Sequence, residues 1–407
     1  MAPIHRVHAP AWPVAVPRAG LLEARGRHAD RVERVSIRRV TSRPASVVVV
    51  AAMLVLVGCR APAVEDAPEP AAPRPEPDAA PEEPEPALPP DDPEPEPDDA
   101  DDADDPPPLA EPVFEEFAVP AGTHPHDVAP GPDGRVWYTG QHTGELGVLD
   151  PETGDVEVVA LGTGSAPHGV IVDDDGVPWI TDGGLNAIVK VDPDTNEVTT
   201  FPLPRFDGAN LNTASFDGDG RLWFTGQTGA YGKVDPASGD VEVYDAPRGR
   251  GPYGIATTPD GTVWFSSLAG SYIARITTAD GDLEVVDVPS PDGGARRVWS
   301  DSVGRLWVTE WFVGSLAVHD PADGSWQTWR LPGDDPQPYA VYVDEDDLVW
   351  VTDFGGDALV RFDPETEEFD VFLWPTAGAQ VRQLLGRPGE IWGAGSGTDT
   401  LVVLRTR

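Results

Sequence analysis

The sequence predicts an all-β protein whose folded part is a seven-bladed β-propeller with four-stranded blades. Three observations support this prediction. A tryptophan recurs at nearly constant spacing, each repeat holds four short strand patterns separated by tight turns, and the two ends of the repeat array complement each other. A period of about 40 residues with four strands in each repeat is typical of propeller blades. The array spans residues 113–407, and two segments of different composition, 1–59 and 60–112, precede it.

The tryptophan period defines the blades. The tryptophans are Trp137, Trp179, Trp223, Trp264, Trp307, Trp350 and Trp392. The intervals between them are 42, 44, 41, 43, 43 and 42 residues. Each lies in the second of four strand patterns, after a turn such as PDG or DGDG, and Asp-Gly between short apolar runs is a strong hairpin signal. Because they are so regular, we expect these tryptophans to pack between blades and not to bind a ligand.

The ends of the array predict a closed ring. FEEFAVP (114–120) reads as a fourth strand without its blade, and LVVLRTR (401–407) reads as a third strand with no fourth after it. If the N-terminal strand completes the last blade, no sheet edge is left open at the junction. A β-helix or a row of separate sandwiches would also repeat a tryptophan, but neither predicts complementary ends.

Residues 1–59 read as a lipoprotein signal peptide. An Arg-rich lead precedes the apolar run VVVVAAMLVLVG (47–58), which is shorter than the roughly 20 residues that a spanning helix needs. The run ends in Leu56-Val57-Gly58-Cys59, which resembles the lipobox of bacterial lipoproteins and implies cleavage before Cys59 and its lipidation. The length of the lead favours a true start codon near Val35. A buried free thiol is the alternative for a lone cysteine.

Residues 60–112 read as a disordered acidic linker rich in proline. They hold 19 acidic residues against two arginines and little that a core could bury, as in EPEPDDADDADDPPP. Proline stiffens such a segment, so we expect a stalk between a lipid anchor and the propeller. An acidic tail that binds cations is the alternative. Together the two segments predict a protein anchored through its lipid to a membrane of the cell envelope, at the outer membrane or the cell surface.

Composition excludes two further classes. The formal charge of −42 excludes a nucleic-acid binder that works by neutralising phosphates. A single cysteine excludes an intramolecular disulfide and a metal site built from several thiolates. We expect a monomer that binds a small molecule or peptide at the mouth of the propeller.

The candidate site is a ring of polar and aromatic residues at one recurring position. It lies eleven residues before each tryptophan, at the start of the innermost strand. Its members are His126, His168, Asn212, Tyr253, Arg296 and Tyr339, with Arg382 in the shorter seventh repeat. Packing alone would favour apolar residues there. Two adjacent blades both supply histidine, in HPHDV (124–128) and APHGV (166–170), and histidine serves as a base or ligand near neutral pH. The alternative is that each histidine only caps its loop.

The repeats resemble those of the virginiamycin B lyase family, also called streptogramin B lyases. GPYGIATTPDGTVWFSS (251–267), YIARI (272–276) and SAPHGVIVDDDGVPWITD (165–182) carry the resemblance. It implies a seven-bladed lyase that uses Mg²⁺ to open a cyclic depsipeptide antibiotic at its ester by elimination. It also implies two histidines on adjacent blades, of which His126 matches the first and His168 the second, the general base.

The match to the family is incomplete around the metal. The family has a glutamate two residues before the second histidine, where this chain has Ala166. Asp182 is the nearest candidate for a second family acid that follows the tryptophan of that blade. His124 and His142 are further polar side chains near His126 in the sequence. We therefore take Asp182 and, more weakly, His124 as candidate metal ligands.

Three functions remain open from the sequence. The first is a metal-assisted C–O lyase in which His168 and His126 act on the substrate. In this reading, substrate is bound by Asn212, Tyr253, Arg296, Tyr339 and Arg382. The second is a non-catalytic envelope lipoprotein whose propeller binds a glycan, peptide or protein partner. The third is a metal-dependent lactone hydrolase, which would need a cluster of Glu, Asn and Asp, and for which only Asn212 and acids such as Glu310 are available.

Overall fold

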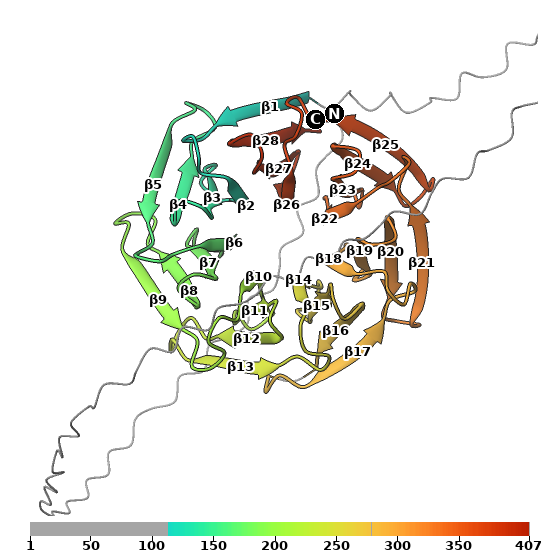
Figure 1. Ribbon diagram of the computed structural model, residues 1–407, viewed down its shortest axis with the longest axis horizontal. Helices are drawn as coiled ribbons and strands as arrows, with labels where there is room; N and C mark the ends of the chain where they lie inside the picture. The colour runs from blue at the N-terminus through green and yellow to red at the C-terminus, as the bar shows by residue number, and fades with distance from the viewer. Residues whose placement is uncertain (1–112, 278, 407) are drawn as a thin grey trace, which may run out of the picture. The chain divides into compact units, whose positions relative to one another are not determined.

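The propeller prediction is confirmed. The computed structural model describes residues 113–277 and 279–406, and seven antiparallel four-stranded sheets stand around a common axis (Figure 1). The described part of the chain holds no helix with the length and hydropathy that a membrane span requires. The predicted signal peptide, the lipidation site Cys59 and the linker 60–112 lie outside the described residues.

Six blades are built from consecutive strands, and the seventh combines the two ends of the array. Their strands are β2 (Pro125–Pro130), β3 (Val136–Gly140), β4 (Glu145–Leu149) and β5 (Val156–Ala160); β6 (Pro167–Val172), β7 (Pro178–Asp182), β8 (Ala187–Val191) and β9 (Val198–Pro202); β10 (Leu211–Phe216), β11 (Leu222–Gly226), β12 (Ala230–Val234) and β13 (Val241–Asp245); β14 (Pro252–Thr257), β15 (Val263–Ser267), β16 (Tyr272–Ile276) and β17 (Leu283–Asp287); β18 (Ala295–Ser300), β19 (Leu306–Glu310), β20 (Ser315–Asp320) and β21 (Ser325–Arg330); β22 (Pro338–Val343), β23 (Val349–Asp353), β24 (Ala358–Asp363) and β25 (Glu368–Leu373); and β26 (Val381–Arg387), β27 (Glu390–Gly395), β28 (Thr400–Arg405) and β1 (Val113–Ala118).

The N-terminal strand closes the ring, as the sequence predicts. β1 pairs with β28 over its whole length, from Val113 opposite Arg405 to Ala118 opposite Thr400. The ring of Phe117 stacks on Trp392 of the same blade at 5.7 Å between centroids. The closure therefore couples backbone pairing to aromatic packing, and it leaves no open sheet edge at the junction.

The seven periodic tryptophans are buried in the packing between blades, each at most 3% exposed. In four blades the indole Nε1 donates to an aspartate six residues earlier, in the turn before the strand. These aspartates are Asp173, Asp217, Asp301 and Asp344. The other oxygen of Asp173 accepts the amides of Asp175 and Val177, so the carboxylate also shapes its own turn. The Asp-rich turns are thus tied to the tryptophans that they precede.

A β-bulge interrupts the first strand of every blade near its start. In β2 the pairing with β3 shifts between Pro125 and Val128, and equivalent shifts occur in β6, β10, β14, β18, β22 and β26. A bulge re-aims the side chains that it inserts. One or two residues at the start of each inner strand therefore leave the regular alternation of the sheet.

A hydroxyl group two residues after the tryptophan holds the bulge in six blades. The residues are Thr139, Thr181, Thr225, Ser266, Thr309 and Thr352. Each accepts a hydrogen bond from a backbone amide of the bulge in its own blade. All except Thr352 also donate to a backbone carbonyl in the bulge of the next blade. The same small side chain thus fixes the local geometry and joins neighbouring blades.

We expect Thr309→Val to destabilise the propeller by about 2 kcal/mol, although valine has nearly the same shape. The change leaves the amide of Arg297 and the carbonyl of Tyr339 buried without their partner, since Thr309 Oγ1 lies 3.0 Å from each. Denaturant unfolding measures the difference. Thr328→Val, at an exposed position of β21, is the matched control and should stay within about 0.5 kcal/mol of the wild type. Equal effects of the two changes would show that the bridge contributes nothing.

Candidate functional site

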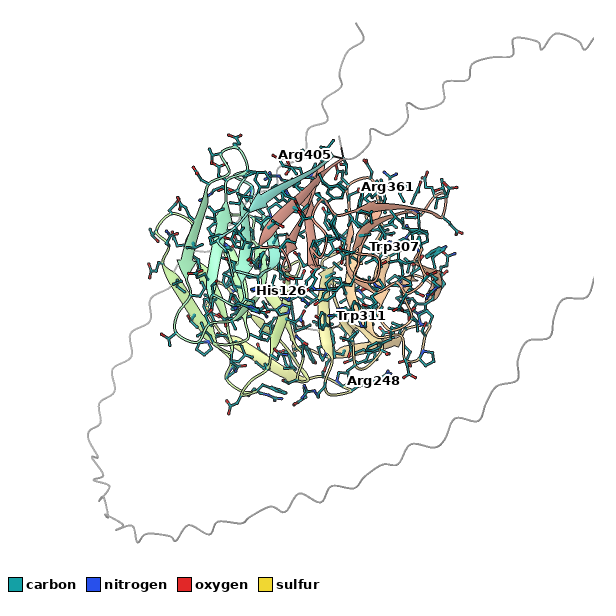
Figure 2. The ribbon with its side chains drawn as sticks, turned by 45° about the horizontal axis from the view of Figure 1, so that its top comes forward. His126, Arg248, Trp307, Trp311, Arg361 and Arg405 are labelled. Carbon is teal, nitrogen blue, oxygen red and sulfur yellow. The ribbon has the colours of Figure 1, made fainter. Side chains whose placement is uncertain are left out.

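The bulges bring the predicted ring residues together at one mouth of the propeller. We call this set the mouth ring: His126, His168, Asn212, Tyr253, Arg296, Tyr339 and Arg382. Five of them are at most 5% exposed, and Arg296 and Arg382 are partly buried. His126 lies near the centre of the ring of blades (Figure 2). The position that the tryptophan period singled out therefore brings residues of different blades into contact with one another.

Two histidine rings face each other on adjacent blades. The centroids of His126 and His168 are 3.8 Å apart, and the rings are tilted by 47°. Nδ1 of His126 lies 2.7 Å from Oδ1 of Asp127. Because a carboxylate only accepts, Nδ1 of His126 carries the proton and Nε2 carries the lone pair. The aspartate thus sets the tautomer of the histidine that precedes it.

His168 has one satisfied and one unsatisfied nitrogen. The side-chain amide of Asn212 donates to Nε2 of His168 at 3.2 Å, which leaves the ring proton on Nδ1. Nδ1 is buried and has no hydrogen-bond partner among the described residues. A buried donor without an acceptor costs about 1–3 kcal/mol, and functional sites are where such a cost persists. A ligand oxygen that entered the mouth would satisfy it.

Burial keeps both imidazoles neutral. It is the largest cause that lowers the pKa of His126 well below its ordinary value, and the guanidiniums of Arg297 and Arg382 add to it. Burial also lowers the pKa of His168, with a further contribution from His126. Burial raises the pKa of Asp127, although Arg297 lies 3.6 Å away and opposes the shift. At neutral pH the pair therefore consists of uncharged imidazoles, one of which is an oriented proton acceptor.

The opposite side of the mouth combines arginine with aromatic rings. The guanidinium of Arg296 lies 3.5 Å from the ring centroid of Tyr339, 4.3 Å from Trp311 and 4.8 Å from Tyr253. The hydroxyl groups of Tyr253 and Tyr339 are 2.6 Å apart, and Nη2 of Arg296 donates to the former at 3.0 Å. Burial is the main cause that raises the pKa of Tyr253 to about 12. Burial also acts on Tyr339, but the guanidiniums of Arg296 and Arg297 outweigh it and lower its pKa.

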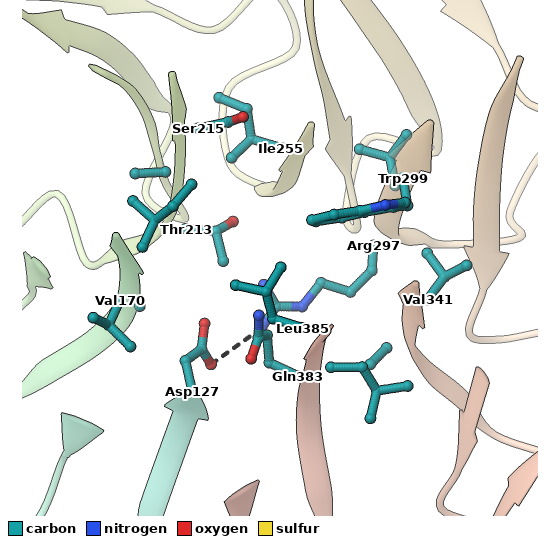
Figure 3. Close-up of a pocket in the computed structure, with 16 residues that line it drawn as sticks. Asp127, Val170, Thr213, Ser215, Ile255, Arg297, Trp299, Val341, Gln383 and Leu385 are labelled. Carbon is teal, nitrogen blue, oxygen red and sulfur yellow. Dashed lines mark ion pairs between the residues drawn. The ribbon is translucent and has the colours of Figure 1, made fainter. Parts of the chain in front are cut away.

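The structure also places residues in the site that the sequence reading missed. Asp127 and Arg297 come directly after mouth-ring residues, in HPHDV and in ARRV, and form an ion pair across the axis (Figure 3). Both line a cavity of about 50 Å³ that is otherwise bounded mainly by apolar side chains such as Val170 and Trp299. The sequence feature that could have identified them is that each directly follows a mouth-ring residue, because a bulge turns two successive residues toward the axis.

Asp182 does not join the histidines. It is fully buried, and its carboxylate accepts hydrogen bonds from the amides of Ala166 and Leu185 and from the hydroxyl of Ser165. Asp353, at the equivalent position of another blade, accepts three loop amides in the same way. An acid three residues after the tryptophan therefore ties together the loops of its own blade.

His124 and Glu310 also have local partners. His124 Nδ1 lies 2.9 Å from the carbonyl of Ser396, and its ring packs on His142 at 4.3 Å between centroids. Glu310 accepts hydrogen bonds from the amide and hydroxyl of Ser290. Within residues 113–277 and 279–406, a lactonase-type cluster of carboxylates around Asn212 is not found.

In the described part of the chain, the group with the spacing of a metal site is His126, Asp127 and His168, whose ligand atoms lie within 4.8 Å of one another. This donor set does not fit magnesium, which prefers an octahedron of oxygens, since two of the three donors are imidazole nitrogens. The contact between His126 and Asp127 is itself a hydrogen bond, and Arg297 faces the same carboxylate. We therefore derive no catalytic step through Mg²⁺.

We expect the histidine pair to make the protein less stable as the pH falls from about 7 to 5. A histidine whose pKa is lower in the folded chain binds fewer protons there than in the unfolded chain, so acid favours unfolding. Chemical unfolding at several pH values should give a flatter dependence for His126→Gln/His168→Gln than for the wild type. The exposed Thr328→Val, which removes no titratable group, is the control and should keep the wild-type slope. A double variant with the wild-type slope would contradict the lowered pKa values.

The fold is similar to that of known lyases. The virginiamycin B lyase from Staphylococcus aureus is 19% identical, with a TM-score of 0.68 over 72% of this chain and 99% of that chain. A streptogramin B lyase is 22% identical, with a TM-score of 0.67 over 73% of this chain and 98% of that one. A catalytically inactive histidine-to-alanine variant of the S. aureus enzyme, solved with quinupristin, has the same TM-score of 0.68, 19% identity and the same coverage. Identities this low establish the fold alone.

The same architecture occurs in a different setting. The extracellular domain of a protein described as a one-component system from B. thetaiotaomicron is 15% identical, with a TM-score of 0.55 over 71% of this chain and 40% of that chain. No curated protein sequence matches the chain. A sequence model of the Virginiamycin B lyase family, however, matches residues 110–362 and 248–400, which together cover nearly the whole propeller. The chain therefore belongs to the virginiamycin B lyase family.

Proposed function

We propose that this protein is a C–O lyase that opens an ester in a cyclic depsipeptide or a related substrate by elimination. The observation that carries the proposal is the buried pair of neutral imidazoles at the mouth, one of them oriented by Asp127. Buried titratable groups with shifted pKa values are typical of catalytic sites. Membership in the family and the loss of activity in the histidine variant of the S. aureus enzyme support the same chemistry.

His126 is the general base in this proposal. Its Nε2 takes the proton from the carbon next to a carbonyl, the C–O bond at the adjacent carbon breaks, a C=C bond forms, and the ester oxygen leaves as a carboxylate. The imidazolium that results is stabilised by Asp127, 2.7 Å from Nδ1. This assignment differs from the expectation from family resemblance, which gave the role to His168, because only His126 has a carboxylate on its second nitrogen.

His168 is the electrophilic partner in this proposal. Its Nδ1–H donor is buried and unpartnered, and a donor in that state gains most from the negative charge that develops on a carbonyl oxygen as the proton is removed. Asn212 holds the tautomer by donating to Nε2. The two imidazoles thus divide the reaction, one accepting the proton and the other stabilising the enolate.

A non-catalytic binding protein is the second candidate. The observation that favours it is the arginine and aromatic cluster of Arg296, Tyr253 and Tyr339, which suits recognition and needs no chemistry. The extracellular domain with the related fold agrees with such a role. In this case the histidine pair would only contribute hydrogen bonds to the bound partner.

Mass spectrometry of a depsipeptide such as quinupristin incubated with the protein tests the lyase. Elimination converts the ester to an alkene and a carboxylic acid of unchanged total mass, whereas hydrolysis adds one water. We expect a ring-opened product of unchanged mass, and a loss of about a thousandfold in kcat/KM for His126→Gln. The exposed His142→Gln serves as the control.

Two results would contradict the lyase. A product heavier by one water would identify a hydrolase. If no depsipeptide in a panel that varies ring size and side chains is opened, the catalytic proposal fails and the binding protein becomes the better description.

A further inference from the structure

Two arginines of the mouth ring, Arg296 and Arg382, lack a carboxylate partner in the part of the chain that the structure describes. Residues 113–407 hold 48 acidic and 17 basic residues, so acids are abundant. Most other arginines of the described chain pair with an acid, as Arg305 does with Asp301 and Arg361 with Asp370. Neither Arg296 nor Arg382 forms an ion pair with a carboxylate of the described residues. Within this part of the chain, the two guanidiniums therefore have no direct carboxylate partner at the mouth of an acidic protein.

Arg296 is held in place by neutral groups. Its guanidinium stacks on Tyr339 and packs against Trp311, and its Nη2 donates to the hydroxyl of Tyr253. Its Nε is buried and has no hydrogen-bond partner in the described chain. A guanidinium offers five N–H donors, so this arginine has donor capacity left for a ligand. The aromatic rings fix its plane in advance, which reduces the entropy that a ligand must overcome.

Arg382, in β26, lies near the same tyrosine ring as Arg296, which belongs to β18 two blades earlier. Its Nε donates to Ser396 Oγ at 3.0 Å and its Nη2 to Gln380 Oε1 at 3.2 Å, so both partners are neutral. Its guanidinium lies 5.9 Å from the ring centroid of Tyr339, against which Arg296 stacks, and 5.6 Å from Phe354. Two pre-oriented guanidiniums thus flank one aromatic ring at the mouth.

We propose that the mouth binds an organic carboxylate between Arg296 and Arg382, with an attached apolar or aromatic group against Trp311 and Phe354. As a statement about the substrate this rests on the lyase proposed above, and it names the class: a depsipeptide or related ester that also bears a free carboxylate. Planar guanidiniums match the geometry of a carboxylate. Trp311 and Phe354 are partly exposed, and the adjacent Phe312 is 63% exposed, so apolar surface lies next to the charge.

The charge of the rest of the molecule limits the ligand to few negative charges. With 48 acidic residues against 17 basic ones, residues 113–407 repel a ligand that carries many negative charges. A single carboxylate interacts mainly with the two nearby arginines, because more distant charges are screened by salt. The two sides of the mouth differ in chemistry. The blades that begin with β2, β6 and β10 supply imidazole and amide groups, and the blades that begin with β14, β18, β22 and β26 supply arginine and aromatic groups.

Calorimetry with phenylacetate and its neutral counterpart phenylacetamide tests the proposal on the intact protein. We expect phenylacetate to bind and phenylacetamide to bind at least tenfold more weakly. Arg296→Gln should weaken phenylacetate binding about tenfold or more. Arg382→Gln should also weaken it, and it serves as the test variant if Arg296→Gln does not fold. Arg250→Gln removes the same charge from an exposed loop and should leave the affinity nearly unchanged.

Four outcomes would overturn the inference: no binding of phenylacetate, equal binding of the amide, an equal loss in Arg250→Gln, or tighter binding of inorganic phosphate than of phenylacetate. The lyase is judged separately. Carboxylate binding without elimination of any depsipeptide keeps this site and removes the enzyme. Elimination of a neutral depsipeptide without carboxylate binding keeps the enzyme and removes this site.

Discussion

The hydroxyl group two residues after the tryptophan, present in six of the seven blades, is the contact on which the mouth of the propeller depends. Thr139 accepts the amide of Asp127 in its own blade and donates to the carbonyl of His168 in the next, so one side chain sets both the bulge and its distance from its neighbour. The tryptophans pack between the blades, and turn aspartates accept hydrogen bonds from four of their indole groups. Because six of the seven bulges are anchored in this way, residues from different blades meet at the mouth within hydrogen-bonding distance.

Most of the fold follows from periodicity that the sequence displays openly. Tryptophan spacing, Asp-Gly turns and complementary ends predict the blade number, the four strands and the closure by β1, and all three are confirmed. The ring position could also be found, since polar residues recur there. The bulge could not, because it changes which residues face the axis without changing the repeat length. Asp127 and Arg297 were missed for that reason, and Asp182, chosen from the family pattern, binds its own loops.

The mouth of the propeller carries arginines, whereas the propeller as a whole is acidic. An acidic body surrounds a mouth in which Arg296, Arg297 and Arg382 all act on His126 and lower its pKa together with burial. The same arginines face a tyrosine pair and a histidine pair. A site of this kind favours neutral bases and anionic ligands at once, which is the combination that an elimination releasing a carboxylate requires.

The protonation of the two imidazoles is the property on which the proposed chemistry depends. Long-range proton–nitrogen NMR of labelled histidine in the intact protein at pH 6 measures it directly. We expect His126 to be neutral with its proton on Nδ1 and its lone pair on Nε2, and His168 to be neutral as well. A protonated imidazolium at either position, or His126 with its proton on Nε2, would contradict the assignment of His126 as the base.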